Sequence, residues 1–400
     1  MDFAFSEDQG LLRDSLAAYL SDRYDFDSRR KAAAQAPGWR PGVWKAFAEE
    51  LGILGAPFPE ALGGLGGGAE ANMIVMEALG EHLVLEPYLE TVVLSGGLLE
   101  RIGGEAAETL IGQIVSGEAV VVLAYAEPSS RYDLDAVHTA AWREEDGWRL
   151  DGHKAVVAAA PWATHLLVTA RAEGEGGEFH GESLFLVAAN GEGVSLRDYA
   201  TMDGRRAAEV TLEDAPATLL GEEGGALPHL EAAVDAATAA ACAEAVGLMR
   251  RMHRETVEYA RQRRQFGRAI GEFQVIQHRL VDMFMAVEQA VSMTYLATLS
   301  LGEEPAARAR AVSAAKARVG KSIREVGQGA VQIHGGIGMT DELALGWRFK
   351  RATAIEQLFG DTEYHLRRFE RSGAGVPEPG AAAAAASAPT AAAAPTAATP

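Results

Sequence analysis

The order of secondary-structure signals along the chain predicts an α+β fold with an N-terminal all-α domain, a middle antiparallel β-barrel domain and a C-terminal four-helix bundle. Long apolar stripes at helical spacing fill both ends of the chain. Short β-branched and aromatic runs, separated by Gly, Asp and Asn turns, fill the middle, and no helical stretch alternates with them. Strands in this arrangement are typical of a small antiparallel barrel or sandwich. We therefore expect domains at residues 1–117, 118–225 and 226–371.

The N-terminal segment begins with a helix-start signal. Ser6 and Gln9 form a capping box, and apolar residues at helical spacing follow it. The glycine-rich run 63–68 then interrupts the helical pattern. Residues 64–69 formally fit the dinucleotide-binding pattern G-x-G-x-x-A, but that pattern requires a preceding strand, and here it lies between two helical stretches. We interpret it as a turn.

The middle segment carries six short runs with strand character. They are Val120–Tyr125, Trp148–Leu150, Ala155–Val157, Leu166–Thr169, Leu184–Val187 and Glu209–Leu212.

The C-terminal segment carries long helical patterns at about 228–263, 273–300, 305–335 and 341–371, which indicate a bundle. Residues 372–400 are mostly Ala, Pro and Thr, so they lack the apolar surface that would offset the entropy of ordering. We expect a disordered tail there.

Composition excludes several classes of function. The formal net charge is −20, which disfavours binding to nucleic acid. The apolar runs are short and bounded by charge, so we expect no membrane span and no secretory signal. A single cysteine, Cys242, excludes an intrachain disulfide and a thiolate metal cage, so we expect no metal. These features favour an acidic, cytoplasmic protein, most simply an enzyme or an enzyme subunit.

The densest local motif is the basic stretch 261–274, which contains Arg263, Phe266, Gly267 and Gln274. Basic residues at a helix end complement the helix dipole, but several guanidinium groups can also clamp a pyrophosphate. The stretch resembles the "RxxFG…FQ" segment of the acyl-CoA dehydrogenase family. Three further stretches, in that family's order, strengthen the resemblance across residues 1–371: the opening helix, the "TEPxxxSD…NGxK"-like residues 126–133 and 151–154, and the "QxxGGxG"-like residues 332–338.

The resemblance implies FAD chemistry, in which an acyl-CoA loses an α-proton to a carboxylate and a β-hydride to the flavin. It places this chain's own residues in three groups. Arg263, Phe266 and Gln274 would hold the FAD of a neighbouring subunit, with Gln332, Gly335 and Gly336 near its pyrophosphate and adenine. Tyr125, Ala126, Val156, Val157, Ala158 and Thr362 would contact flavin within the subunit. Asp235 and Tyr132 would contact the CoA-bearing substrate. We expect His334, at a variable position of the motif, to pack between helices.

The chain departs from the family where the family has its catalytic base. Gly360 stands in the usual Glu position, and Ala237 stands at the alternative base position, followed by Thr238. In the β domain, residues 156–158 replace a flavin-stacking "WIT", and Tyr132 replaces a substrate-binding Ser. The N–H of Gly360 would still polarise the thioester carbonyl, as oxyanion-type donors do.

Three carboxylates are candidates for the missing base. Glu244 lies seven residues after Ala237 on the same helix face, among small apolar residues, where burial would raise its pKa. A structural Glu paired with an Arg is an equal alternative. Asp361 and Glu363 lie near the right loop, where solvated turn carboxylates are the default interpretation. The partner subunit is the remaining source of a base.

Three functions follow as hypotheses. The first is a subunit of an FAD-dependent acyl-CoA dehydrogenase that forms trans-2-enoyl-CoA, paired with a homologous large subunit (α2β2) or with itself, and reoxidised by an electron-transfer-flavoprotein-type acceptor. The second is a non-catalytic subunit that completes the flavin site of a catalytic partner. The third is a helical binding protein without flavin.

Overall fold

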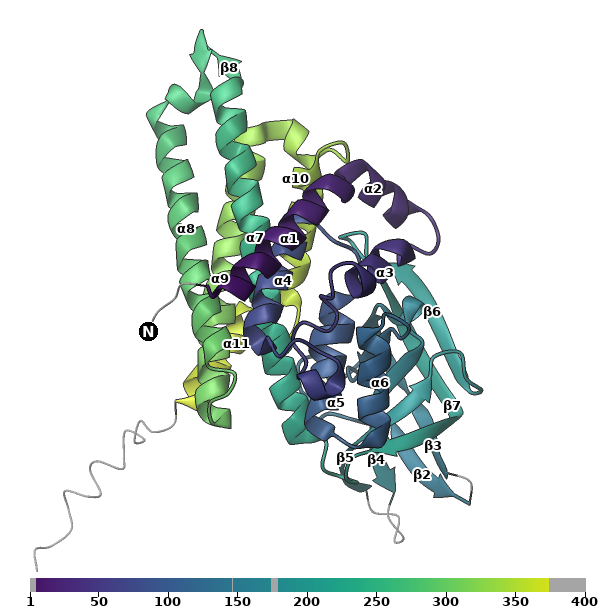
Figure 1. The fold of residues 1–400 in the computed structure, drawn as a ribbon. Coiled ribbons are helices and arrows are strands. Elements are labelled where there is room, and N and C mark those ends of the chain that lie inside the picture. The colour runs from purple at the N-terminus through teal and green to yellow at the C-terminus, as the bar shows by residue number, and fades with distance from the viewer. Residues whose placement is uncertain (1–4, 146, 174–178, 374–400) are drawn as a thin grey trace, which may run out of the picture.

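In a computed structural model of the protein, residues 5–145, 147–173 and 179–373 are described. The predicted tail lies outside these residues from position 374 onward. Figure 1 shows long helices standing along one side of the molecule, with the strands gathered beside their lower half. A hairpin carrying β8 projects beyond the opposite end of the long helices.

The N-terminal part is helical, as predicted. The capping box at Ser6 is confirmed, because its side chain accepts from the Gln9 N–H and the Gln9 side chain accepts from the Ser6 N–H. The glycine-rich run 63–68 connects two helices and follows no strand, which agrees with a turn. The elements are α1 (Glu7–Arg23), α2 (Phe26–Ala34), α3 (Pro41–Glu49), η1 (Glu60–Leu62), α4 (Gly68–His82), the π-helix η2 (Leu89–Gly96), α5 (Gly97–Ile102) and α6 (Glu105–Val115).

The middle part is a closed seven-stranded barrel. Its strands are β1 (Val121–Ala124), β2 (Ala140–Glu144), β3 (Gly147–Ala158), β4 (His165–Glu173), β5 (Phe179–Ala188), β6 (Val194–Ala200) and β7 (Arg206–Leu220), with the short helix η3 (Ala160–Trp162) after β3. Strands β2, β3, β7, β5 and β4 pair in a ring, and β1 and β6 join β4 and β7. The pairs β1–β4 and β2–β4 are parallel, so the predicted barrel is mixed and not wholly antiparallel.

Two of the expected strands proved to be one. Residues 148–150 and 155–157 both belong to β3, whose pairing with β7 shifts register between Leu150 and Gly152 and again between Lys154 and Val157. Bulges of this kind bend a long strand and interrupt its alternation, which is why it looked like two short runs.

The C-terminal part contains the long helices α7 (Leu227–Gln262), α8 (Gln274–Leu299) and α9 (Pro305–His334) at the expected places, with β8 (Arg264–Gln265), β9 (Arg268–Ala269) and the short helices η4 (Ile270–Glu272) and η5 (Gly335–Met339) between them. The fourth helix predicted at 341–371 is two helices, α10 (Ala344–Gln357) and α11 (Thr362–Ser372). Phe359 and Gly360 have φ of 57° and 117°, which no α-helix accommodates, so the helix breaks there.

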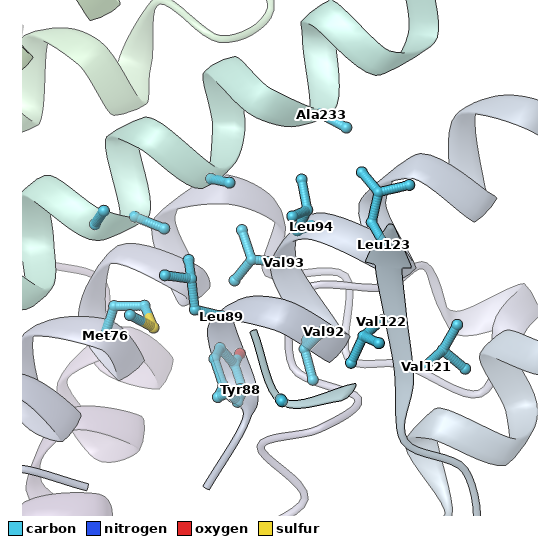
Figure 2. Close-up of a cluster of buried hydrophobic side chains, with 14 of the residues drawn as sticks. Met76, Tyr88, Leu89, Val92, Val93, Leu94, Val121, Val122, Leu123 and Ala233 are labelled. Carbon is cyan, nitrogen blue, oxygen red and sulfur yellow. The ribbon is translucent and has the colours of Figure 1, made fainter. Parts of the chain in front are cut away.

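One core joins the three parts. Figure 2 shows Leu89, Val93 and Leu94 of η2 in one cluster with Ala233 of α7 and the β1 residues Val122 and Leu123. The proposed domain boundaries at 117 and 225 fall in the connections from α6 to β1 and from β7 to α7.

Candidate functional site

A pocket of about 510 Å³ lies where the barrel meets the C-terminal helices. Its wall comes from the segment after β1, the N-terminal half of α7, the turn between α10 and α11, and α11 itself. The structure brings together three residues that the sequence predicted as ligand contacts, Tyr125, Tyr132 and Asp235, and the two neighbours of Gly360, namely Phe359 and Asp361.

Two tyrosines from different parts of the chain meet in this pocket. The rings of Tyr132 and Tyr364 lie 5.2 Å apart between centroids and are tilted by 54°. The Tyr132 hydroxyl donates to the Gln357 side chain at 3.3 Å. The pair therefore links the segment after β1 to α10 and α11. The sequence singled out Tyr132 but not Tyr364.

The carboxylate of Asp235 is not open to a ligand. Only 1% of the residue is exposed, and its two oxygens accept from Arg308 at 2.9 Å and Arg368 at 2.6 Å. Both oxygens of this predicted substrate contact are therefore engaged by arginines in this structure. Asp235 holds the guanidinium of Arg368, which lines the pocket and which the sequence analysis missed.

The turn at Gly360 has no room for a side chain. A Cβ at this position would lie 2.4 Å from Cδ1 of Tyr364 and 2.8 Å from Nε2 of His365, and φ is 117°. The Gly360 N–H, expected to face the thioester, donates weakly at 3.4 Å to the Gln357 carbonyl. The packing around position 360 therefore agrees with a glycine there.

Glu244 is a buried ion-pair residue. It is 1% exposed, lies outside the pocket lining, and accepts from Arg351 through both oxygens at 2.7 Å and from Arg205 at 3.0 Å. Burial alone would raise its pKa, but the charges of Arg351 and Arg205 outweigh burial and lower it. The expectation of a raised pKa was wrong, and the structure favours the alternative of a structural Glu held by Arg.

The two other candidate bases are also occupied. Asp361 is the N-cap of α11, where its side chain accepts from the Tyr364 N–H at 2.8 Å. Glu363 pairs with Arg367 on the same helix. Both residues line the pocket, and Ala237 and Thr238 are buried in α7.

The predicted flavin clamp stands on the projecting hairpin in Figure 1. Arg263 ends α7, and the tip of the hairpin is Phe266-Gly267, with φ of 52° and 81°. Two positive φ values suit a tight two-residue hairpin, but a phenylalanine rarely adopts one. Phe266 is 92% exposed, and Arg263 and Gln274 are exposed as well. A strained, exposed aromatic tip is typical of a surface that another molecule covers.

The QIHGG turn lies beside the base of that hairpin. His334 stacks on Tyr259 of α7 at 4.2 Å between centroids, and its Nδ1 lies 2.9 Å from the Ala330 carbonyl, which agrees with the expected helix-packing role. Gln332, Gly335 and Gly336 are exposed near it. These residues and the hairpin thus form one face, at a distance from the barrel in Figure 1.

The barrel residues predicted to contact flavin form a second group. Val156 is 63% exposed with a φ of 53°, which is unusual for a β-branched residue, whereas Val157 is buried. The main chain of Ala126 is tied to that of Ala155 at 2.8 Å, which holds the two stretches together. Thr362 has a buried hydroxyl that lacks a hydrogen-bond partner among the described residues.

The described part of the chain contains no group of three or more His, Cys, Asp or Glu side chains that could hold a metal ion. Among the same residues, the helix α7 is long and apolar enough to span a membrane, but 94% of its most apolar stretch is buried inside the protein, as in a core helix.

Comparison with known proteins agrees with the fold. The chain matches the N-terminal, middle and C-terminal domain models of acyl-CoA dehydrogenase over residues 6–118, 122–215 and 230–373. Acyl-CoA dehydrogenase FadE27 of Mycobacterium tuberculosis is 30% identical over 84% of this chain and 88% of its own length. The ChsE4-ChsE5 complex from the same organism contains a chain that is 28% identical, with a TM-score of 0.84 over 94% of this chain and all of that one. The FAD complex of PigA shares the fold, with 24% identity and a TM-score of 0.84 over 93% and 98% of the two chains.

The fold and the family matches therefore define an oxidoreductase of the flavoprotein type. This chain belongs to the acyl-CoA dehydrogenase family.

Proposed function

We propose that this chain is a subunit of an FAD-dependent acyl-CoA dehydrogenase in which a homologous partner subunit supplies the catalytic base. The observation that carries this proposal is the state of the carboxylates around the pocket. Position 360 is a glycine without room for a side chain, and Glu244 is held by two guanidinium groups. Asp361 caps a helix. Glu231 and Glu363 also line the pocket. We assign the base for the α-proton to another chain because positions 237, 244 and 360 offer no free carboxylate.

The residues present fit FAD. A flat aromatic system could lie against the exposed Val156, and the orphaned Thr362 hydroxyl would gain a partner. On the second face, Arg263 and Phe266 are exposed and therefore accessible to a cofactor held by a neighbouring subunit. A guanidinium suits a pyrophosphate because it can donate two parallel hydrogen bonds.

In the proposed reaction, the thioester lies in the pocket beside the Phe359–Asp361 turn. The α C–H bond breaks and its proton passes to the partner's carboxylate. FAD, held by residues such as Val156 and Thr362, would supply the oxidant that takes the β-hydrogen with its electron pair, and the product would be a trans-2-enoyl-CoA. An electron-transfer-flavoprotein-type acceptor then takes the two electrons. We propose the cytoplasm as the compartment, since the one cysteine is a free, buried thiol.

The test uses the full-length chain co-expressed with a homologous large subunit from the same organism. We expect a yellow complex whose flavin is bleached anaerobically by acyl-CoA. Arg263→Ala should lose flavin, whereas Arg264→Ala, on the same hairpin, should keep it. Full flavin occupancy in Arg263→Ala would contradict the clamp. Replacing the partner's base by its amide should abolish bleaching, and bleaching that persists would contradict a base in trans.

The second candidate is a structural subunit that only completes the partner's flavin site. Positions 237 and 360 carry no carboxylate, and the carboxylate of Glu244 is paired with Arg351; both facts favour this candidate. A photoreactive acyl-CoA separates the two candidates. Labelling of this chain supports a thioester in its pocket, and labelling of the partner alone supports the structural role.

A further inference from the structure

The pocket between the barrel and the C-terminal helices has a charged outer part and a buried inner part. Every exposed residue of its lining is charged, as Arg131, Glu231 and Arg371 are. By contrast, Asp235 and His365 of the same lining are each only 1% exposed. A ligand that arrives from solvent therefore passes the charged outer part before it reaches the inner part.

Two half-buried tyrosines, Tyr132 and Tyr364, stand on different walls of this pocket. Their ring centroids are 5.2 Å apart, a spacing at which two rings are in contact, so a ligand chain cannot pass between them. Burial raises the pKa of Tyr364, Arg368 opposes this, and the charges of Asp235 and Asp133 add to it. Tyr364 is thus close to a carboxylate of the inner part and to one of the outer part.

Tyr364 is the fixed half of the pair. A Cβ at position 360 would lie 2.4 Å from its Cδ1, so its ring packs directly on Gly360. The same ring meets the ring of His365 edge-on, with centroids 5.1 Å apart. Its main-chain N–H donates to the Asp361 carboxylate at 2.8 Å in the first turn of α11. Helix, glycine and histidine together hold this ring in place.

Tyr132 lies on a short strap, residues 130–135, that is anchored to the barrel domain at both ends. At one end the Ser130 hydroxyl accepts from the Glu127 N–H at 2.8 Å and donates to the Glu127 carbonyl at 3.0 Å. At the other end Asp135 accepts from Arg171 of β4 at 3.1 Å. The strap can therefore change its conformation between two fixed points.

The strap is only weakly tied to the C-terminal helices. Among the described residues, its hydrogen bonds and ring contacts to those helices are the Tyr132–Tyr364 pair and one hydrogen bond of 3.3 Å from the Tyr132 hydroxyl to Gln357. Arg131, beside Tyr132, has a φ of 51°, which a residue other than glycine rarely adopts. Backbone strain of this kind is found in segments that switch between two conformations.

We propose that Tyr132 and Tyr364 form a gate across the pocket, and that the strap moves Tyr132 away from Tyr364 to admit the acyl-CoA. This inference rests on the proposed function. Only two weak contacts hold the gate closed, so an open state populated at about 0.1–10% is expected. Since only the open state binds, the gate raises the apparent dissociation constant by the reciprocal of that fraction.

The first test follows entry of a ligand into this chain alone. The flavin-loaded assembly is mixed rapidly with a photoreactive acyl-CoA and flashed after increasing delays, and the label on this chain is measured after the subunits are separated. In the wild type the rate constant for labelling should level off as the acyl-CoA concentration rises, because opening becomes limiting. Tyr132→Ser should remove this limit and lower the apparent dissociation constant about tenfold or more.

Two further variants sharpen this test. Tyr132→Phe loses only the hydrogen bond to Gln357, so its behaviour should be intermediate. Tyr199→Ser replaces another half-buried tyrosine, on β6 and outside the pocket lining, and should match the wild type. Labelling of Tyr132→Ser with wild-type kinetics and affinity overturns the gate and leaves the proposed function intact. A chain that is labelled neither as wild type nor as Tyr132→Ser contradicts the proposed function itself.

A second measurement detects the gate without a ligand. A single 3-fluorotyrosine is placed at position 364 of this chain, and its ¹⁹F signal is followed by relaxation dispersion, which reports motion on the microsecond-to-millisecond timescale. We expect exchange between a major and a minor state in the ligand-free assembly. In Tyr132→Ser the signal should not exchange and should lie at the frequency of the minor state. A signal without exchange in the wild type, and at the same frequency in Tyr132→Ser, overturns the gate whatever the labelling shows.

Discussion

Arg351 of α10 grips Glu244 of α7 with two hydrogen bonds of 2.7 Å, one from Nε and one from Nη2, across 107 positions of sequence. The third guanidinium nitrogen of Arg351 donates to Asp203 at 2.9 Å. Arg205 completes the cluster by donating to Glu244 at 3.0 Å and to the Val84 carbonyl at 2.9 Å. Buried charges are tolerated when they are paired in this way, and they become costly when one partner is removed.

Replacement of Glu244 should therefore affect stability and not chemistry. Glu244→Gln would leave Arg351 and Arg205 with only Asp203 and Glu90 as charged partners, so we expect a loss of about 3–5 kcal/mol in the free energy of unfolding, measured with denaturant. Flavin reduction by acyl-CoA in the assembled complex should be unchanged where the protein remains folded. The exposed Glu303→Gln is the control. A stable variant that no longer reduces flavin would make Glu244 the base.

A side chain at position 360 should be costly whatever its chemistry. Gly360→Ala places a Cβ against Tyr364 at a φ of 117°, so we expect a loss of about 1–3 kcal/mol in the free energy of unfolding. Gly10→Ala is the matched control. It lies in α1 with nothing within 4 Å of the new Cβ, so it should gain about 0.5–1 kcal/mol. Equal stabilities for the two variants would contradict the packing described at the turn.

Asp361 should behave as a helix cap. Asp361→Asn keeps the capping oxygen, so the free energy of unfolding and the rate of flavin reduction should both stay near wild type. Asp361→Ala removes the cap of α11 and should cost about 1 kcal/mol. Thermal unfolding and stopped-flow flavin reduction measure the two quantities. A stable Asp361→Asn protein with abolished reduction would instead identify this carboxylate as a base.

The barrel carries a carboxyl that makes stability depend on pH. The side chain of Glu182 is wholly buried, and neither oxygen has a hydrogen-bond partner among the described residues. Burial and then the nearby carboxyl of Asp135 raise the pKa of Glu182 from 4.5 to about 7, although Arg171, 3.8 Å away, opposes them. Because the folded state holds this proton more tightly, the contribution of Glu182 to stability is present below pH 4.5 and is lost as pH rises through 7.

Glu182→Gln should remove this dependence. We expect the variant to be more stable than wild type at pH 8, by about 1–3 kcal/mol, and to show little difference at pH 5. Denaturant unfolding at the two pH values measures this. The exposed Glu213→Gln on β7 should show no such pH-dependent gain. A Glu182→Gln protein whose advantage is the same at both pH values would contradict a raised pKa.

Local signals predicted much of the fold. The capping box at Ser6, the α7–α9 stripes and the glycine-rich turn after η1 depend on neighbours in sequence, and each lies where the pattern placed it. The prediction was wrong where non-local pairing decides. Register shifts within β3 conceal one long strand, and β1 and β2 pair with β4 in parallel, which no local pattern encodes.

The site was predictable as a set of positions but not as a set of contacts. The resemblance to a family placed Tyr132, Asp235 and Gly360 close to one another, and they meet at one pocket and its edge. It could not show that Asp235 is already bound by Arg308 and Arg368, because those residues lie 73 and 133 positions away.

The short turn between β6 and β7 has a consequence for recombination between relatives. In this turn Asp203 accepts from Arg351, and Arg205 donates to Glu244, both in the C-terminal helices. Toward the N-terminal part, Arg205 also donates to the Val84 carbonyl, and Arg29 of α2 donates to the Asp203 carbonyl. A chimera that imports the middle domain alone would separate charges that are matched across two junctions. Exchange of that domain between family members should therefore succeed only when these partner residues are exchanged with it. The charges of the three domains are thus matched as one set.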